Sequence, residues 1–202
     1  HYLARYDDGR YAEILLNGDI HQVNAEKIGI DRRAVKTITY AFLYGAGDIK
    51  IGKSYDPLLE PTKARRKGKE IRQAYMDAIP GLEKLVGATK EAAKRGFIKA
   101  IDDRKLTVDS GHKALNYLLQ GSAGVIAKRW MINAHETIHT NKIECRQLCF
   151  LHDELQFETT STYVNDLKFT LLYAAQAAGE HYNTRCPVAA EAGSGPTWAD
   201  TH

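Results

Sequence analysis

The sequence predicts an α+β fold that is mostly helical and contains one prominent β-hairpin. Apolar residues recur at helical spacing along most of the chain, and residues 147–159 have the pattern of two strands around a tight turn. The chain has 202 residues, of which 44% are hydrophobic and 26% are charged. This composition supports a sizeable core and excludes wholesale disorder. No run of eighteen apolar residues occurs, which excludes a membrane-spanning helix.

The first two expected helices are bounded by residues that start or stop helices. The N-terminal helix ends at the turn pair Asn17-Gly18. Asp31 is a suitable N-cap for a second helix, which stops at Gly45-Ala46-Gly47. A loop is expected from there through Pro57 and Pro61.

The later elements are separated by similar signals. Pro80-Gly81 divides two helices, and Asp102-Asp103 marks a turn inside a strand-prone segment. The chain ends in a tail that contains Gly and Pro. The expected elements are helices over about 62–78, 82–94, 113–139 and 164–182, and strand-prone segments over 98–108 and 147–159.

Charge is distributed unevenly along the chain. Residues 1–105 contain 21 Lys and Arg against 15 Asp and Glu, a balance of +6, and residues 106–202 contain 7 against 10, a balance of −3. A basic part joined to an acidic part suits a protein that binds a polyanion with one part and positions carboxylates with the other. Ordinary variation of surface charge is the alternative and produces the same numbers. The three cysteines are not spaced for a metal site and indicate a reducing compartment.

The segment Gly47–Ser54 matches the P-loop pattern letter for letter. In a P-loop the backbone N–H groups cradle phosphates while Lys and Ser meet phosphate and Mg²⁺. That arrangement needs a strand before the loop and a helix after it. Here a helix is expected before it, and Tyr55-Asp56-Pro57 disfavours a helix after it. A P-loop nucleoside triphosphatase is therefore a less favoured alternative.

The helix that begins at Asp31 has two different faces. Arg32, Lys36, Tyr40 and Tyr44 lie at four-residue steps and form one stripe. An apolar face on the other side consists of Val35, Ile38 and Phe42. The two cations of the stripe suit a polyphosphate, and its two rings suit a flat base. The alternative is a solvated amphipathic helix whose tyrosines cover a neighbour.

Two adjacent carboxylates, Asp153 and Glu154, lie between the apolar halves of the expected hairpin. Carboxylates at the tip of a buried hairpin are costly without a compensating cation. Mg²⁺ prefers oxygen ligands and bridges readily to phosphates. The sequence therefore indicates a magnesium site at this turn, with an ordinary surface turn as the alternative.

Two amide side chains, Asn116 and Gln120, are four residues apart on one helix face. Such amides can read minor-groove acceptors that all base pairs share, which suits binding without sequence preference. Helix caps and solvated amides are the alternative. Arg104 and Lys105 follow the expected turn and suit phosphate contacts that position a duplex.

Several of these motifs together resemble family A DNA polymerases, and the resemblance extends over the whole chain. The run Arg32-x3-Lys36-x3-Tyr40-x3-Tyr44-Gly45 is similar to motif B, and Asp31 to Gly47 resembles the fingers helix of the phage replicative branch. The triplet His152-Asp153-Glu154 is similar to motif C. Further matches are Gly18-Asp19-Ile20-His21, Arg104-Lys105, Asn116 with Gln120, and the terminal Gly195-Pro196-Thr197-Trp198-Ala199-Asp200-Thr201-His202.

The resemblance implies a role for each matching residue. Asp153 is a catalytic metal ligand, Glu154 supports the metal site, and Lys36 acts in catalysis as well as in nucleotide binding. The other implied nucleotide-binding residues are His21, Arg32 and Tyr40, and the implied DNA-binding residues are Tyr44, Arg104, Lys105, Asn116, Gln120, His152 and His202.

Two of these positions carry a specific implication. Tyr at position 40 implies weak discrimination against sugars that lack the 3′-hydroxyl. Asp103 stands where the family has Gly, which puts the turn before Arg104 in question.

The resemblance also implies that this sequence holds only part of the catalytic site. The family binds two Mg²⁺ ions between motif C and an Asp of motif A, an Asp-x-Ser-x-x-Glu-Leu-Arg-like strand. The sequence begins at His1-Tyr2-Leu3-Ala4, inside the helix that follows this strand, so the motif A Asp is expected upstream of His1. Asp7-Asp8 is a poor substitute because it is expected in solvent. The strand beside the motif C hairpin is also expected upstream, which leaves an apolar strand edge unpaired.

The implied organisation has three parts. Residues 1–20 are a palm helix, residues 21–98 are the fingers, and residues 99–202 are the C-terminal palm. The implied function is the addition of dNTPs to a primer 3′ end on template DNA. The chain is expected to be inactive alone, and to need an upstream segment or chain that supplies motif A, a thumb and possibly an exonuclease.

The implied location is a bacterial cytoplasm, either of a phage host or of the organism itself. The alternatives are a non-catalytic DNA-binding module and the P-loop triphosphatase at Gly47–Ser54.

Overall fold

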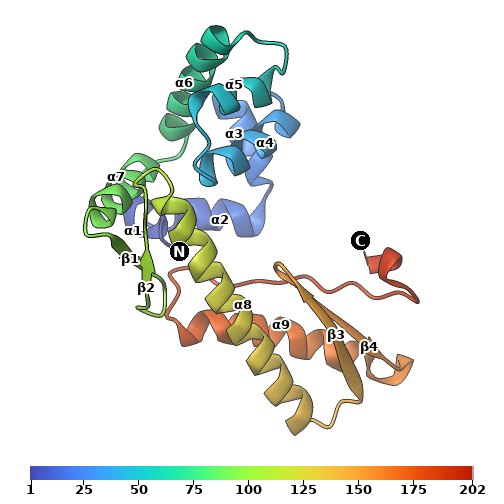
Figure 1. Cartoon of the computed structure of the whole chain (residues 1–202). Coiled ribbons are helices and arrows are strands. Elements are labelled where there is room, and N and C mark those ends of the chain that lie inside the picture. Colours follow the sequence, from blue (N-terminus) through green and yellow to red (C-terminus); the bar gives the residue numbers. More distant parts are fainter. Residues whose placement is uncertain (202) are drawn as a thin grey trace. The chain divides into compact units, whose positions relative to one another are not determined.

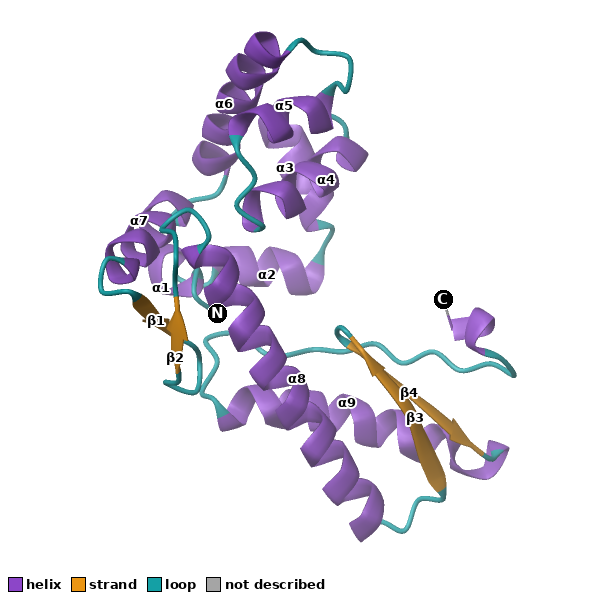
Figure 2. Ribbon diagram, viewed as in Figure 1, coloured by secondary structure: helices purple, strands orange, loops and turns teal. Residues whose placement is uncertain are grey.

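The computed structural model describes residues 1–201, so the expectation for His202 lies outside the described residues. The chain divides into two compact units, residues 1–120 and 121–202, and each is described by itself. Helices predominate, and the strands form two separate antiparallel pairs within the described residues (Figures 1 and 2), which confirms the α+β class. No helix of residues 1–201 is long and apolar enough to cross a membrane.

The first unit consists of helices followed by a small sheet. Its helix α8 continues into the second unit (Figure 1). The elements are α1 (Ala4–Asp7), α2 (Arg10–Asn17), α3 (Ile20–Ile28), α4 (Arg32–Leu43), α5 (Asp48–Tyr55), α6 (Pro61–Ala78), α7 (Leu82–Ala93), β1 (Phe97–Lys99), β2 (Lys105–Thr107) and the start of α8 (Ala114–Thr140).

Buried apolar clusters hold the first unit together. One is built around Phe42, Tyr75 and Leu115, and the rings of Phe42 and Tyr75 are 5.0 Å apart. Another joins Ile38 of α4 and Ile51 of α5 to α6. Burial removes apolar surface from water, and each fully buried side chain of this size contributes about 2 kcal/mol. The two clusters therefore hold α4 against the packed pair of α5 and α6.

The N-terminal helix is interrupted, in contrast to the expectation. Asp7 is only 2% exposed, and its carboxylate accepts hydrogen bonds from the backbone N–H groups of Gly9 at 2.9 Å and Tyr11 at 2.8 Å. The bond from Tyr11 satisfies one free donor in the first turn of α2, and the bond from Gly9 holds the turn before it. The expectation that Asp7 faces solvent is wrong, whereas Asp8 is exposed.

Helices α3 and α5 were not expected from the sequence. Asp19 caps α3 by accepting from the N–H groups of His21 and Gln22. The segment expected as a loop forms α5, which packs closely on α6. A Cβ on Gly52 would overlap the carbonyl oxygen of Ala64, and one on Gly68 would overlap that of Asp48. Only glycine permits this approach, which makes tertiary packing the cause of the α5 helix.

The turn between β1 and β2 forms despite its non-glycine residue. Asp103 has φ 61°, a left-handed conformation that glycine adopts more easily. Its N–H donates to the carbonyl of Ala100 at 3.0 Å, and its carboxylate lies 3.1 Å from Lys99 Nζ. The turn in question is therefore present, and local bonds compensate the backbone strain.

The second unit contains the rest of α8, the hairpin β3 (Cys145–Leu151) and β4 (Glu154–Thr159), the short helix η1 (Ser161–Tyr163), α9 (Val164–His181) and η2 (Trp198–Thr201). Trp130 Nε1 of α8 donates to the carbonyl of Leu171 in α9 at 2.8 Å. This bond satisfies the indole where its ring is partly buried. This bond therefore links α8 to α9.

Candidate functional site

The α4 stripe has the geometry expected from its spacing. Val35 and Ile38 on the apolar face are 0% and 1% exposed, whereas Tyr40 and Tyr44 are 47% and 55% exposed. Arg32 and Lys36 are also exposed. Asp31 begins the helix by accepting from the N–H of Ala34 at 3.0 Å, as predicted.

Residues from the start of α3 lie beside this stripe. The rings of His21 and Tyr40 are 6.4 Å apart, and the buried Nδ1 of His21 has no hydrogen-bond partner among the described residues. Arg32 Nε lies 2.6 Å from Asp19 Oδ2. This guanidinium, with the backbone N–H of Gln22, lowers the pKa of Asp19. Three of the predicted nucleotide-binding residues are therefore brought together in the first unit.

The pairing of Arg32 with Asp19 was missed by sequence reasoning. Asp19 lies in a segment that resembles the family, but the resemblance implies no role for it. Its signal was present, because an Asp before a helix is a common N-cap and a nearby Arg is a natural partner. Lys36, in contrast, has no ion pair among residues 1–201, so its charge is available to an anion.

The end of α4 depends on one glycine. Gly45 has φ 72°, and a Cβ there would lie 2.8 Å from the carbonyl oxygen of His112. Both the backbone conformation and the space require Gly. This close approach fixes the C-terminal end of α4, where Tyr44 stands, against the segment that leads into α8.

The predicted DNA-contacting residues of the first unit lie on two further elements. Arg104 is exposed and pairs with Asp102 at 2.6 Å, and Lys105 Nζ lies 4.7 Å from the ring centroid of Phe97. On α8, Asn116 is half-buried and Gln120 is exposed. Both amides stand inside the helix, so neither is a cap of it. The exposed side chains of Arg104, Lys105 and Gln120 are able to contact a nucleic acid, and Asn116 is partly accessible.

In the second unit, Asp153 and Glu154 stand at the tip of the predicted hairpin. His152 adopts φ 55° in the two-residue turn between Leu151 and Glu154. Asp153 is exposed, Glu154 is half-buried, and Gln156 Nε2 donates to Glu154 Oε1. Carboxylate oxygens are acceptors and hard ligands, so both side chains are chemically suited to a cation.

The expectation that the hairpin is buried is wrong for strand β3, whereas Leu155 of β4 is buried. Leu148, Phe150 and Leu151 of β3 are 59%, 36% and 43% exposed. A register shift between Gln147 and Cys149 leaves Leu148 as an extra, bulged residue. Because β3 pairs only with β4 in the described chain, its second edge is unpaired and apolar.

A hollow of about 1060 Å³ lies beside the two carboxylates. It separates the hairpin from the helices and the tail of the same unit. Its wall is mainly apolar and includes Ile126, Trp130, Leu167, Leu171 and Val188. The hollow leaves much apolar surface in contact with water. Exposed apolar surface of this extent usually marks a place where another segment or partner binds.

Asp153 and Glu154 fit the way Mg²⁺ is held beside phosphates. No cluster of three or more His, Cys, Asp or Glu suited to a metal occurs in residues 1–201. Mg²⁺ commonly binds one or two carboxylates together with waters and substrate phosphates, so these two carboxylates suit one part of such a site. Their hard oxygen donors suit Mg²⁺ better than a softer metal.

The segment with the P-loop pattern does not form a phosphate-cradling loop. Gly47 is the N-cap of α5, and residues 48–55 are helical. The Ser54 hydroxyl donates to the carbonyl of Lys50 within this helix at 2.9 Å. The preceding element is α4 and not a strand. The geometry therefore gives no support to the triphosphatase alternative.

Comparison with known proteins relates these sites to one family. The sequence matches DNA polymerase family A over residues 10–200. The DNA-directed DNA polymerase of Enterobacteria phage T3 is 32% identical over 228 residues, which cover 100% of this chain and 31% of that protein. The DNA-directed DNA polymerase of Escherichia phage T7 is 32% identical over 225 residues, with the same coverage of both. That of Escherichia phage Phieco32 is 34% identical over 200 residues, 95% of this chain and 32% of the relative.

A solved structure has a similar fold. It is the POL domain of Pol1 from M. smegmatis in complex with DNA primer-template and dNTP. Its TM-score is 0.76 at 23% identity, and the match covers 93% of this chain and 35% of that one. The chain thus spans about a third of the length of the relatives that it matches.

Proposed function

Because the chain belongs to DNA polymerase family A, we propose that it is the fingers and C-terminal palm part of a template-directed DNA polymerase. In this proposal the complete enzyme adds dNTPs to a primer 3′ end. The observation that carries the proposal is the exposed stripe on α4 beside His21 in one unit, together with paired carboxylates at a hairpin tip in the other. The proposed parts are a palm segment at 1–20, which contains α1 and α2, the fingers at 21–98 and the C-terminal palm at 99–202.

On this proposal, the first unit binds the incoming nucleotide. Lys36 and Arg32 meet the triphosphate, and Arg32 must leave Asp19 or share its charge in order to do so. His21 supplies a ring nitrogen that has no partner within the described chain. Tyr40 packs beside the sugar and base, and Tyr44 stacks at the template position. Lys36 and Arg32 stabilise the transition state most if they lie beside the phosphate oxygens on which negative charge develops during transfer.

Duplex DNA is proposed to contact the remaining predicted residues. Arg104 and Lys105 bind backbone phosphates near the primer end, which positions the duplex without reading its sequence. Asn116 and Gln120 contact acceptors in the minor groove that all base pairs share. His152 lies next to the carboxylates in the hairpin turn, and is proposed to lie near the primer terminus.

Asp153 and Glu154 are proposed to hold Mg²⁺ at the hairpin tip. When bound, two such ions activate the primer 3′-hydroxyl and stabilise charge on the transferred phosphorus. Asp153 is exposed and can approach both a cation and a phosphate. Glu154 accepts a hydrogen bond from Gln156, which restrains its carboxylate.

A further segment is proposed to complete the palm. Its motif A strand would pair with the exposed edge of β3 and cover Leu148 and Phe150. That strand would carry the second Asp of the metal site, on a segment that also supplies the thumb and possibly an exonuclease. The phage and bacterial relatives support action in a bacterial cytoplasm.

Complementation tests the proposal. The 202-residue chain is mixed with a polypeptide that carries the motif A strand, and extension of a labelled primer is measured with dNTPs and Mg²⁺. Extension is expected only from the mixture, and Asp153→Ala abolishes it. If DNA affinity changed neither on addition of nucleotide nor in Asp153→Ala, a non-catalytic DNA-binding module would be favoured instead. ATP hydrolysis lost with Lys53→Ala but not with Lys36→Ala would favour a triphosphatase.

A further inference from the structure

The side of α5 and α6 away from the core carries a strong positive charge. Lys50, Lys53 and Arg65 line a hollow of about 700 Å³ with Gly47, Asp48 and Ile49. The three cations are exposed and have no ion pair among residues 1–201. The single carboxylate of the hollow, Asp48, is already engaged by Arg72 at 2.7 Å. An anion placed there would therefore meet uncompensated positive charge.

The hollow has a rigid frame. Gly52 and Gly68 bring the backbones of α5 and α6 into direct contact, so the two helices cannot slide without a clash. Arg72 Nη2 also donates to the carbonyl of Ala46, which fixes the start of α5. The fold therefore sets the spacing between Lys53 on α5 and Arg65 on α6. Because the site is already organised, binding a ligand costs little additional conformational entropy.

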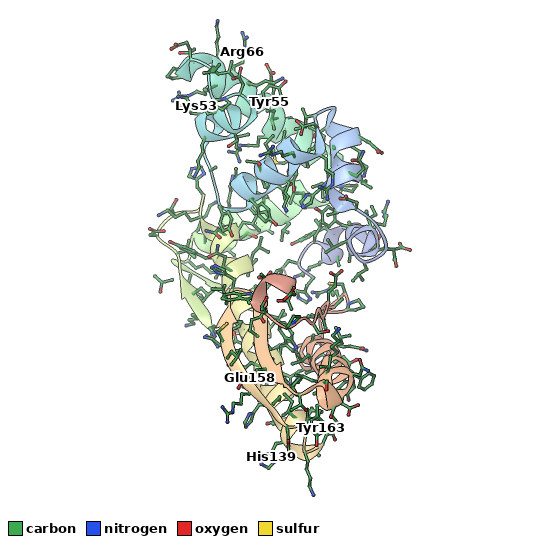
Figure 3. The ribbon with its side chains drawn as sticks, turned by 90° about the vertical axis from the view of Figure 1, so that its right-hand side faces the viewer. Lys53, Tyr55, Arg66, His139, Glu158 and Tyr163 are labelled. Atoms are coloured by element: carbon green, nitrogen blue, oxygen red, sulfur yellow. The ribbon has the colours of Figure 1, made fainter. Side chains whose placement is uncertain are left out.

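An exposed aromatic ring, that of Tyr55, lies on a different side of α5 from the hollow. Tyr55 is 44% exposed, and Lys67 Nζ lies 5.0 Å from its ring centroid. Figure 3 shows Lys53, Tyr55 and Arg66 at the same end of the first unit. Of these groups only Arg66 and Lys67 approach a carboxylate, that of Glu70, at 3.9 and 3.7 Å. An exposed ring among cations is typical of surfaces that bind unpaired bases.

We propose that Lys50, Lys53 and Arg65, with Tyr55, form a binding site for single-stranded nucleic acid, separate from the α4 stripe. The cations bind backbone phosphates in the hollow, and a base stacks on Tyr55. The two features lie on different sides of one short helix. Stacking on Tyr55 requires a base that is not paired, and a single strand is flexible enough to reach both features.

Fluorescence anisotropy of the 202-residue chain tests this site without primer, nucleotide or catalysis. The probe is a labelled oligothymidylate of about 20 nucleotides, which exceeds the length that such a surface covers. Lys53→Glu combined with Arg65→Glu is expected to weaken binding about tenfold or more, and to reduce the slope of log K against log salt by about 1.4. The matched control, Lys84→Glu combined with Lys90→Glu on α7, changes the charge equally and is expected to bind nearly as the unaltered chain does.

A second pair of variants tests the stacking contact. Tyr55→Ala is expected to weaken binding about fivefold or more, whereas Tyr173→Ala, which removes an even more exposed ring of the second unit, leaves it unchanged. Asp153→Ala is also expected to leave it unchanged, which separates this inference from the proposed polymerase function.

Several results would overturn the inference. If the α5–α6 variant and its α7 control lost probe affinity equally, the binding would depend on net charge and not on this site. Loss confined to an Arg104→Glu and Lys105→Glu variant would assign it to the proposed duplex contacts. Displacement of the probe by polyglutamate, or by ATP alone, as effectively as by unlabelled oligothymidylate would show a site for acidic polymers or for free phosphates.

Discussion

The contact between α5 and α6 makes a sharp prediction for Gly68→Ala. A Cβ at this position would overlap the carbonyl oxygen of Asp48 and lie 2.9 Å from the nitrogen of Gly52. Ordinary nonbonded separations are about 3.5 Å, so the two backbones would have to move apart by about 1 Å or more. Overpacking of this kind costs about 3 kcal/mol, and the better helix propensity of Ala returns about 1 kcal/mol. The expected net loss of unfolding free energy is about 2 kcal/mol.

Thermal unfolding followed by circular dichroism measures this loss, with Gly87→Ala as the matched control. Gly87 is also inside a helix of the first unit, but a Cβ there would meet nothing within 4 Å. Gly87→Ala is therefore expected to stabilise by about 1 kcal/mol. At about 3 °C per kcal/mol for a chain of this size, Tm falls by about 6 °C in one variant and rises by about 3 °C in the other. Equal Tm values for the two variants would refute the close approach of α5 and α6.

Three other substitutions test local features of the fold. Asp103→Gly is expected to raise the free energy of unfolding, measured in urea, by about 0.5 kcal/mol. The substitution relieves about 1 kcal/mol of left-handed backbone strain but loses the exposed ion pair with Lys99. A loss of stability would contradict this. Asp7→Ala is expected to cost about 2 kcal/mol in the same assay, because it leaves two N–H groups without acceptors, and no change would show that water replaces the carboxylate. Since hydrogen bonds from Arg32 and backbone N–H groups lower the pKa of Asp19, its contribution to stability is present above the usual Asp pKa of about 4 and lost as the pH falls below it. Between pH 6 and pH 3 the unaltered chain should therefore lose more stability than Asp19→Asn, and equal losses would argue against the ion pair.

The elements that the sequence predicts well are those whose signals are local. Asp31 caps α4 as expected, and the apolar face of that helix is buried. The helices α6, α7, α8 and α9 and the hairpin lie within a few residues of their expected bounds. In each case periodicity, caps and turn residues agree with the final packing.

The elements that were missed depend on contacts from elsewhere in the chain. Helix α5 contains Gly52 in its interior, which disfavours a helix in isolation, and its stability comes from the backbone of α6. The break at Asp7 arises because a buried carboxylate satisfies backbone donors, and a two-residue acidic pattern resembles a solvated surface. The exposure of β3 was implied by the resemblance and not by the strand's own apolar pattern, which alone favours burial.

The candidate site was predicted by residue type and by motif, but not by its local partners. The stripe on α4 follows from helix geometry alone. The pairing of Arg32 with Asp19 and the approach of His21 to Tyr40 require the turn between α3 and α4, which brings residues far apart in sequence together. No periodicity in the sequence encodes those contacts.

The catalytic role of Asp153 is the central claim, and one measurement tests it most directly. In the enzyme completed with motif A, single-nucleotide extension rates and primer–template affinity are measured for the unaltered chain and for Asp153→Ala. Loss of a metal ligand removes several kcal/mol of transition-state stabilisation, so the rate is expected to fall about a thousandfold or more while DNA affinity changes little. An unchanged extension rate would contradict the assignment of Asp153 to the metal site.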